Sequence, residues 1–414
     1  MKNKILTGLL LVLIGGWGSL SAQSAGSNYA RQVNTLIGTK GVGLTSGYLY
    51  PGATYPYGMV QFTPSYFSKR SGFVINQLSG GGCEHMGNFP TFPVKGKLKM
   101  SPDNILNYRI NISEEKGHAG YYEAKVQEDI HAKLTVTERT GMASYEYPAD
   151  QQYGTVIIGG GISATPIEQA AIVITAPNKC EGYAEGGNFC GLRTPYKVYF
   201  VAEFDTDALE SGTWKRDELK PNTTFAEGEY SGVYFTFDVN KKKNIQYKIG
   251  VSYVSVENAR ENLKAENTGW DFLQIQNQAE SKWNHYLGKI EVEGTNPDRT
   301  TQFYTHLYRS FIHPNVCSDV NGEYMGADFR VHKSRSKHYT SFSNWDTYRT
   351  QIQLLSILDP EVASDIVISH QLFAEEAGGA FPRWVMANIE TGVMQGDPTP
   401  ILISNAYAFC GPQY

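Results

Sequence analysis

Residues 197–205, KVYFVAEFD, decide the fold class because their apolar side chains recur at every second position. Successive side chains of a β-strand point to opposite faces, so this pattern predicts a strand with one face in a core. Residues 232–240, GVYFTFDVN, and 245–255, IQYKIGVSYVS, repeat the alternation. The predicted inward set of the first strand is Val198, Phe200, Ala202 and Phe204.

Glycine-rich turns separate these alternating runs, as in residues 79–82 (SGGG), 158–163 (IGGGIS) and 184–189 (AEGGNF). Short alternating strands with turns between them are typical of an antiparallel sandwich. We therefore expect a β-sandwich domain over residues 23–255. The 13% of aromatic residues fits sandwich cores, and it fits sugar binding equally well.

A helical period replaces the alternation after residue 256. Residues 272–290, FLQIQNQAESKWNHYLGKI, carry one apolar stripe with a spacing of four. Asn296 and Pro297 predict the cap and first turn of the next helix, and Asp359 and Pro360 predict another. We interpret residues 256–295 as a helical linker and residues 296–414 as the start of a helical catalytic domain. Only three or four helices fit there, fewer than we expect for a closed helical domain.

The N-terminus predicts export. Residues 1–22 contain two lysines, an apolar run from Ile5 to Ile14 and small residues up to Ala22, which is typical of a cleaved signal peptide. We expect a periplasmic or secreted, soluble protein without a lipid anchor. The net charge of −5 and the absence of a basic block argue against nucleic acid as a partner.

The five cysteines do not form an even disulfide framework, and no CxxC pair predicts zinc. Cys180 and Cys190 lie close enough in sequence to close a small loop, although two buried thiols are the alternative that we favour. Cys83, in residues 80–89 (GGGCEHMGNF), is interpreted as part of a structured turn rather than as a nucleophile.

Residues 341–350, SFSNWDTYRT, are the main candidate for binding chemistry. Trp345 is expected to stack on a sugar ring while Asp346 accepts hydrogen bonds from its hydroxyls, and Arg349 would keep Asp346 ionised. The alternative is that Asp346 caps the following helix. Arg383 and Trp384 after the next helix, and Asp397 before the last one, extend the candidate set.

Residues 313–333 contain acidic side chains among glycines and faintly resemble a calcium loop. The spacing of Asp319, Asn321, Glu323 and Asp328 does not match an EF-hand, so ordinary turn chemistry is the favoured interpretation. The GxSxG, HExxH and phosphate-loop motifs are absent.

Several long motifs resemble exported α-mannosidases of glycoside hydrolase family 92. The resemblance covers residues 29–411. Three motifs resemble the N-terminal sandwich: VNTLIGTKG (33–41), YPGATYPYGMVQFTP (50–64) and LSGGGCEHMGNFPTFP (78–93). Four resemble the opening of the (α/α)₆ catalytic barrel: residues 303–326, 339–361, GGAFPRWVMAN (378–388) and GDPTPILISNAYA (396–408).

The resemblance implies a Ca²⁺-dependent, exo-acting enzyme that removes α-linked mannose from glycans with inversion. Trp345 and Asp346 match a mannose-contacting pair, Trp384 matches an aromatic residue of the same pocket, and Arg383 and Asp397 stand in matching loops. The general acid Glu and general base Asp are expected beyond residue 414, which predicts an incomplete and catalytically silent chain. The alternatives are an exported sandwich that binds glycans without hydrolysing them, and a structural domain without a ligand.

Overall fold

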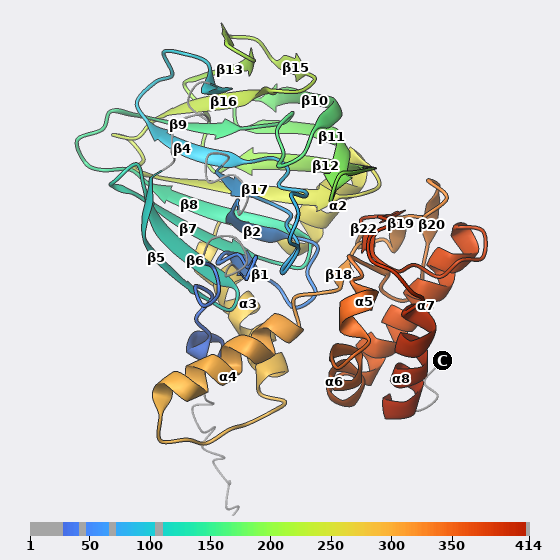
Figure 1. Ribbon diagram of the computed structural model, residues 1–414. Coiled ribbons are helices and arrows are strands. Elements are labelled where there is room, and N and C mark those ends of the chain that lie inside the picture. Colours follow the sequence, from blue (N-terminus) through green and yellow to red (C-terminus); the bar gives the residue numbers. More distant parts are fainter. Residues whose placement is uncertain (1–27, 41–46, 66–71, 104–110, 411–414) are drawn as a thin grey trace, which may run out of the picture.

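The computed structural model describes residues 28–40, 47–65, 72–103 and 111–410 (Figure 1). The predicted signal peptide, residues 1–22, lies outside this part. Two antiparallel sheets pack face to face and confirm the predicted sandwich. The helices of the second half lie beside and below it in Figure 1, in yellow to red.

The first sheet contains eight strands and the second contains nine. In spatial order, the first consists of β1 (Ala53–Thr54), β2 (Gln61–Pro64), β3 (Phe73–Val74), β4 (Thr91–Lys95), β9 (Tyr153–Ile158), β16 (Ser231–Asp238), β13 (Glu210–Lys215) and β14 (Glu218–Pro221). The second consists of β15 (Phe225–Glu227), β10 (Ile167–Ala176), β11 (Lys179–Phe189), β12 (Leu192–Phe204), β17 (Asn244–Ser252), β8 (Thr140–Glu146), β7 (Ile130–Val136), β6 (Tyr121–Val126) and β5 (Ile112–His118).

Strand β12 shows the predicted alternation, and its inward side chains are buried. The Phe204 ring lies 4.9 Å from Phe235 and 5.3 Å from Tyr247, centroid to centroid, so it joins side chains of both sheets. Val201 points outward yet is also buried, because the helix α2 (Val256–Glu266) covers it. Strand β12 therefore buries apolar side chains on both of its faces at the place where α2 packs on it.

The helices of the predicted linker pack on the sandwich, and one of them also contacts the N-terminal segment. The α3 helix (Phe272–Leu287) packs against β7 and against the short 3₁₀ helix η1 (Tyr29–Gln32). Its Trp283 is fully buried, and the indole N–H donates to the Thr54 carbonyl at 2.7 Å.

The remaining part is mainly helical, with three short two-stranded sheets inserted between helices. The helices are α4 (Pro297–Ser310), α5 (Asn344–Thr347), α6 (Gln351–Leu358), α7 (Pro360–Glu376) and α8 (Thr399–Cys410). The two-stranded sheets are β18 (Asn315–Val316) with β21 (Tyr339–Thr340), β19 (Glu323–Met325) with β20 (Val331–Lys333), and β22 (Val385–Met386) with β23 (Ile389–Glu390).

Both predicted helix starts are confirmed. The Asn296 side chain accepts hydrogen bonds from the N–H groups of Asp298 and Arg299, and Pro297 occupies the first turn of α4. Asp359 accepts from the Val362 N–H at the start of α7. In the described residues, no helix is long and apolar enough to cross a membrane.

Arg139 joins the sandwich, the helix α2 and the helical part at one point. Its guanidinium is nearly buried and donates to Glu266 Oε1 on α2 at 2.7 Å and to the Ser318 carbonyl at 2.7 Å. Although burial would lower it, Glu138 and Glu266 hold the pKa of Arg139 above its ordinary value. This ion pair network ties three segments far apart in sequence.

The favoured interpretation, two buried thiols, is confirmed for Cys180 and wrong for Cys190, and the alternative Cys180–Cys190 pairing is also wrong. Cys190 forms a disulfide with Cys83, 107 residues away, and Cys180 is a buried thiol on the inward face of β11. The reason is the direction of the side chains: Cys180 points into the core of the sandwich, while Cys190 lies in the turn after β11. Because it is disulfide-bonded, Cys83 is not a thiol nucleophile, as the turn interpretation expects.

We expect Phe204→Ala to destabilise the chain by about 3–5 kcal/mol, because it opens a cavity between the two sheets. Phe225→Ala is the matched control, since Phe225 on β15 is 54% exposed and lines no core. Urea unfolding followed by far-UV circular dichroism measures both. Equal losses for the two variants would contradict the packing described for β12.

Candidate active site

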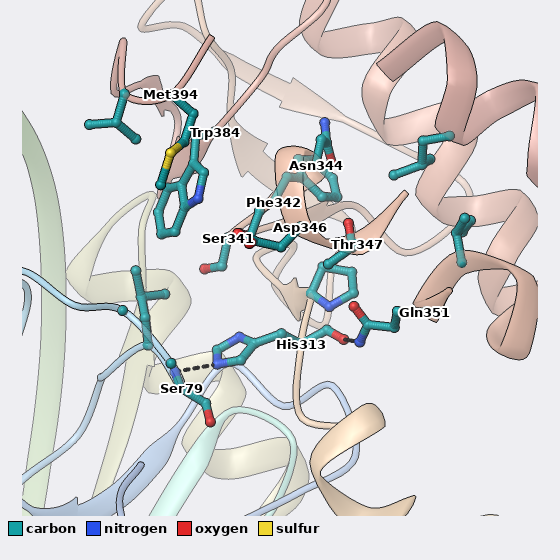
Figure 2. A pocket seen from close by; sticks show the side chains of 18 of the residues that line it. Ser79, His313, Ser341, Phe342, Asn344, Asp346, Thr347, Gln351, Trp384 and Met394 are labelled. Carbon is teal, nitrogen blue, oxygen red and sulfur yellow. Dashed lines mark hydrogen bonds between the residues drawn. The ribbon is translucent and has the colours of Figure 1, made fainter. Parts of the chain in front are cut away.

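A cavity of about 670 Å³ lies between the loops of the sandwich and the helical part (Figure 2). Its walls come from residues 78–83 and 189–190 of the sandwich, and from α4, α6, α7, α8 and residues 313–314, 341–344, 346–347, 384 and 393–394 of the helical part. This volume is within the range of small-molecule sites. Two parts of the chain that are distant in sequence therefore build one pocket.

A glycine segment, residues 80–82, forms the sandwich side of the cavity and is held at its start by two histidines. The Leu78 N–H donates to His85 Nε2 at 2.9 Å, and the Ser79 N–H donates to His313 Nε2 at 2.8 Å, the dashed line between Ser79 and His313 in Figure 2. Gly81 allows this approach, because a Cβ there would lie 2.8 Å from the His85 ring.

His313 is fixed in one neutral form by its neighbours. Its Nδ1 faces Asn315 Oδ1 at 2.8 Å, and the Asn315 amide donates to the carbonyls of Gly58 and Ile312. Nδ1 therefore carries the proton and Nε2 remains free to accept from Ser79. Burial lowers the pKa of His313 to about 4, so the imidazole stays uncharged at neutral pH.

The opposite wall is aromatic. Trp384 is 6% exposed, and its ring stacks on Phe189 with the centroids 4.4 Å apart. Glu390 accepts hydrogen bonds from the backbone N–H groups of Arg383 and Trp384 at 2.6 and 3.1 Å. These contacts fix Trp384, and Figure 2 shows it beside Met394 at the rim.

Asp346 lies at the cavity mouth, and it is the only carboxylate among the described residues that line the cavity. It accepts a hydrogen bond from the Ser343 hydroxyl and is exposed. The helix-cap alternative is wrong, because Asp346 lies inside the short helix α5 and α6 has no side-chain cap.

The expected ion pair between Arg349 and Asp346 is not formed. The Arg349 guanidinium instead donates to the Trp345 carbonyl and lies over the Trp345 ring, 4.3 Å from its centroid. Trp345 is half-buried under this cation and does not belong to the described cavity wall. One turn of helix thus directs these two side chains away from Asp346.

The other two predicted residues also lie outside the described wall. Arg383 donates to the carbonyls of Val393 and Gly392 at 2.9 and 3.3 Å, so it supports the loop that carries Met394. Asp397 is exposed in the loop before α8. Of the five predicted binding residues, the structure therefore brings Asp346 and Trp384 together in the cavity.

Asn344 explains why α5 keeps its place at the mouth. Its side-chain amide is buried and donates to the Pro382 carbonyl at 3.1 Å and to Thr399 Oγ1 at 2.7 Å. These bonds connect α5 to the loop before Trp384 and to the start of α8. The two predicted residues that do line the cavity are thus linked through one amide.

The acidic loop of residues 313–333 is held by a long-range contact rather than by turn chemistry alone. Asp319 is buried and accepts hydrogen bonds from Ser252, Asn258 and Asn262 at 2.6–2.9 Å. Its carboxylate therefore holds the loop to β17 and α2. Burial raises the pKa of Asp319, and the three donors oppose that shift.

Within the described chain, one group has the composition and spacing of a metal site: Asp328, His332 and Glu376, between the β19–β20 hairpin and the end of α7. These residues do not line the cavity. Calcium takes six to eight oxygen ligands. Neither this group, with its imidazole, nor the single carboxylate of the described cavity wall fits such a shell.

Comparison with known proteins decides the family. Residues 32–252 match the model of the glycosyl hydrolase family 92 N-terminal domain, and residues 258–412 match that of the family 92 catalytic domain. The chain belongs to glycosyl hydrolase family 92. The resemblance stated from the sequence motifs is thereby confirmed, and the cavity lies at the junction of the two matched domains.

Solved structures support the fold of this family 92 chain. A family GH92 α-mannosidase from Bacteroides thetaiotaomicron superposes with a TM-score of 0.83 at 24% identity, over 92% of this chain and 56% of the other. An inverting family GH92 mannosidase of the same species gives 0.79 at 24% identity, over 92% and 52%.

A curated relative is an uncharacterized secreted glycosidase from Arthroderma benhamiae, 26% identical over 363 residues. The match covers 78% of this chain and 45% of that protein. The family 92 chain thus spans about half the length of the relatives that it matches.

Sequence reasoning missed the sandwich contribution to the cavity. His313 belongs to residues 313–333, which were interpreted from their acidic side chains. Phe189 belongs to residues 184–189, which were interpreted from their glycines. A histidine directly after a predicted helix, before Pro314, was the available signal for His313. No local pattern indicates that Phe189 meets Trp384, because 195 positions separate them in the sequence.

We expect acid to weaken the native state through His313. Its folded pKa of about 4 lies below the ordinary value of 6.5, so the unfolded chain binds the proton first as pH falls. Stability is therefore fully present above about pH 6.5 and is lost as pH falls toward 4. His313→Gln should remove on the order of 2–3 kcal/mol of this pH dependence.

The matched control is His306→Gln, since His306 is exposed on α4. Urea unfolding of the three proteins from pH 4 to 7 gives the comparison. Curves of equal slope for wild type and His313→Gln would contradict the neutral imidazole described for the Ser79 contact.

Proposed function

We propose that the cavity binds terminal α-linked mannose and that the chain serves an exported, inverting exo-α-mannosidase. The observation that carries this proposal is the position of Asp346 and Trp384 in one pocket at the junction of the two family 92 domains. The α-mannosidases that share the fold, and the secreted glycosidase among the relatives, support it. The predicted signal peptide supports export.

Each wall of the cavity has a task in this proposal. Asp346 accepts hydrogen bonds from two adjacent sugar hydroxyls, since an ionised carboxylate offers two acceptor oxygens. Trp384 presents an apolar surface to the C–H groups of the ring. His313, neutral and held by Ser79, keeps the glycine segment at a fixed distance from that surface.

Inverting hydrolysis needs two carboxyl groups roughly 6.5–9.5 Å apart, one as acid and one as base. The described cavity wall supplies only Asp346. We therefore assign to these residues the binding and orientation of the sugar, while the predicted general acid Glu and general base Asp are not among them. Trp345, Arg383 and Asp397 remain predicted binding residues that lie beside the wall.

The family resemblance also predicts Ca²⁺. Because the described residues do not assemble its six to eight oxygen ligands, the ion is proposed as a requirement of the activity and not assigned to particular side chains.

A second candidate is a glycan-binding protein without hydrolysis. The single carboxylate of the described wall favours it, because binding needs no acid and base pair. The two candidates differ in product release and in their response to calcium.

The first test is mannose release from α-linked mannobioses by the purified chain, with Ca²⁺ and then with a chelator. Calcium-dependent release is the result expected for the mannosidase, with the β-anomer of mannose as first product by NMR. Sugar binding that is unchanged by chelator and gives no product would favour the glycan-binding candidate.

We expect Asp346→Asn to weaken binding of methyl α-mannoside by about 10- to 100-fold, because a charge-assisted hydrogen bond becomes a neutral one. The melting temperature should stay within about 2 °C, since Asp346 is exposed. Isothermal titration calorimetry and thermal unfolding measure the two effects. Asp150→Asn, an exposed aspartate in a turn of the sandwich, is the control. If Asp346→Asn and wild type bind methyl α-mannoside with equal affinity, Asp346 does not contact the sugar.

A further inference from the structure

The Cys83–Cys190 disulfide belongs to the cavity wall. Both cysteines line the cavity, with Cα atoms 5.2 Å apart. Cys190 lies in the exposed turn between β11 and β12, and Cys83 directly follows the glycine segment. A reductant in solution therefore reaches this bond from the turn side. The thiols of Cys180 and Cys317 are buried, so a reagent in solution does not reach them in the same way.

One end of the disulfide adjoins an aromatic ring of the site. Phe189 precedes Cys190, is 3% exposed, and stacks on Trp384. The hydrogen bonds of this turn are internal to the hairpin, as in the bond from the Gly191 N–H to Asn188 Oδ1 at 2.9 Å. In the described structure, the disulfide is thus the covalent link between the hairpin tip and the facing loop.

The other end completes the anchoring of the glycine segment. Hydrogen bonds hold its start, through Leu78 and Ser79, to two histidines. At its far end the Cys83 carbonyl accepts from His85 Nδ1 at 2.7 Å, and the Cys83 side chain is bonded to Cys190. Because glycines have many backbone conformations available, a segment of three needs both ends fixed to present one surface.

We propose that this disulfide controls the sugar affinity of the cavity, so that the oxidised chain holds Phe189 against Trp384 and the reduced chain does not. The inference rests on the proposed function, because the affinity concerned is that for mannose. A dithiol supplies two electrons and two protons. The S–S bond breaks, Cys83 and Cys190 become thiols, and the dithiol closes to its own disulfide.

The test measures two quantities on the full chain before and after treatment with dithiothreitol. One is the dissociation constant for methyl α-mannoside, and the other is the tryptophan emission spectrum. The double variant Cys83→Ser/Cys190→Ser mimics the reduced state. Cys410→Ser is the matched control, because Cys410 is a thiol on α8 outside the cavity wall. Mass spectrometry after alkylation, with and without dithiothreitol, establishes that Cys83 and Cys190 become alkylated only after reduction, while the buried thiol of Cys180 stays unlabelled in both states.

Reduction should weaken sugar binding by about three- to tenfold, the cost of ordering one or two side chains again on binding. The emission spectrum should change, and Trp384→Phe should abolish the change. The double variant should match the reduced chain and ignore dithiothreitol, and Cys410→Ser should behave as wild type. Unchanged affinity in a fully reduced chain would overturn the proposal.

Phe189→Leu tests the same link without touching a cysteine, should the double variant fail to fold. It should bind sugar as weakly as the reduced chain, and reduction should not weaken its sugar binding further. A Phe189→Leu chain that responds to dithiothreitol as wild type does would overturn the assigned role of Phe189. If no sugar binds in either state while the emission changes, the proposed function fails and the positioning of Phe189 by the disulfide stands.

Discussion

The arrangement of the sandwich and the helical part depends on the contacts of one buried group, the guanidinium of Arg139. A charge that is removed from water is tolerated only when nearby acceptors satisfy it, and here they come from three separate segments. Glu138 belongs to the sandwich, Glu266 ends α2, and Ser318 lies in the helical part. The guanidinium is satisfied only when all three segments are in place. The cavity lies between the parts that this contact unites.

The polar contacts of the cavity follow the same logic on a smaller scale. The loops that line the cavity have backbone N–H groups that no strand or helix satisfies. Side chains accept from them instead, as His85 does from Leu78 and His313 does from Ser79. Each neutral imidazole accepts with one nitrogen and donates with the other. Desolvation keeps both rings uncharged, since burial lowers the pKa of His85, like that of His313, to about 4. A pocket assembled from loops thereby gains fixed walls.

Local chemistry predicted the elements, because the determinants of a strand or a helix lie within the element. The alternation in KVYFVAEFD predicted β12, and Asn296 with Pro297 predicted the start of α4. Pairing across the fold was not predictable in this way. Cys190 is bonded to Cys83 rather than to Cys180, because β11 points Cys180 into the core of the sandwich. Likewise the Arg349 guanidinium lies over the Trp345 ring and does not pair with Asp346. The rotamer of Arg349 decides between these two contacts, and sequence spacing does not predict the rotamer.

The glycine segment has an evolutionary consequence. Its three positions differ in what a new side chain would meet: Gly80 has a φ of +82° that disfavours other residues, and Gly81 faces the His85 ring. At Gly82 a Cβ would meet only Tyr48, at an ordinary 3.8 Å. Gly82 is thus the one place in this wall where a single codon change adds a side chain without disturbing the backbone. A residue other than glycine at this position would change the lining of the cavity while the backbone of the segment is kept.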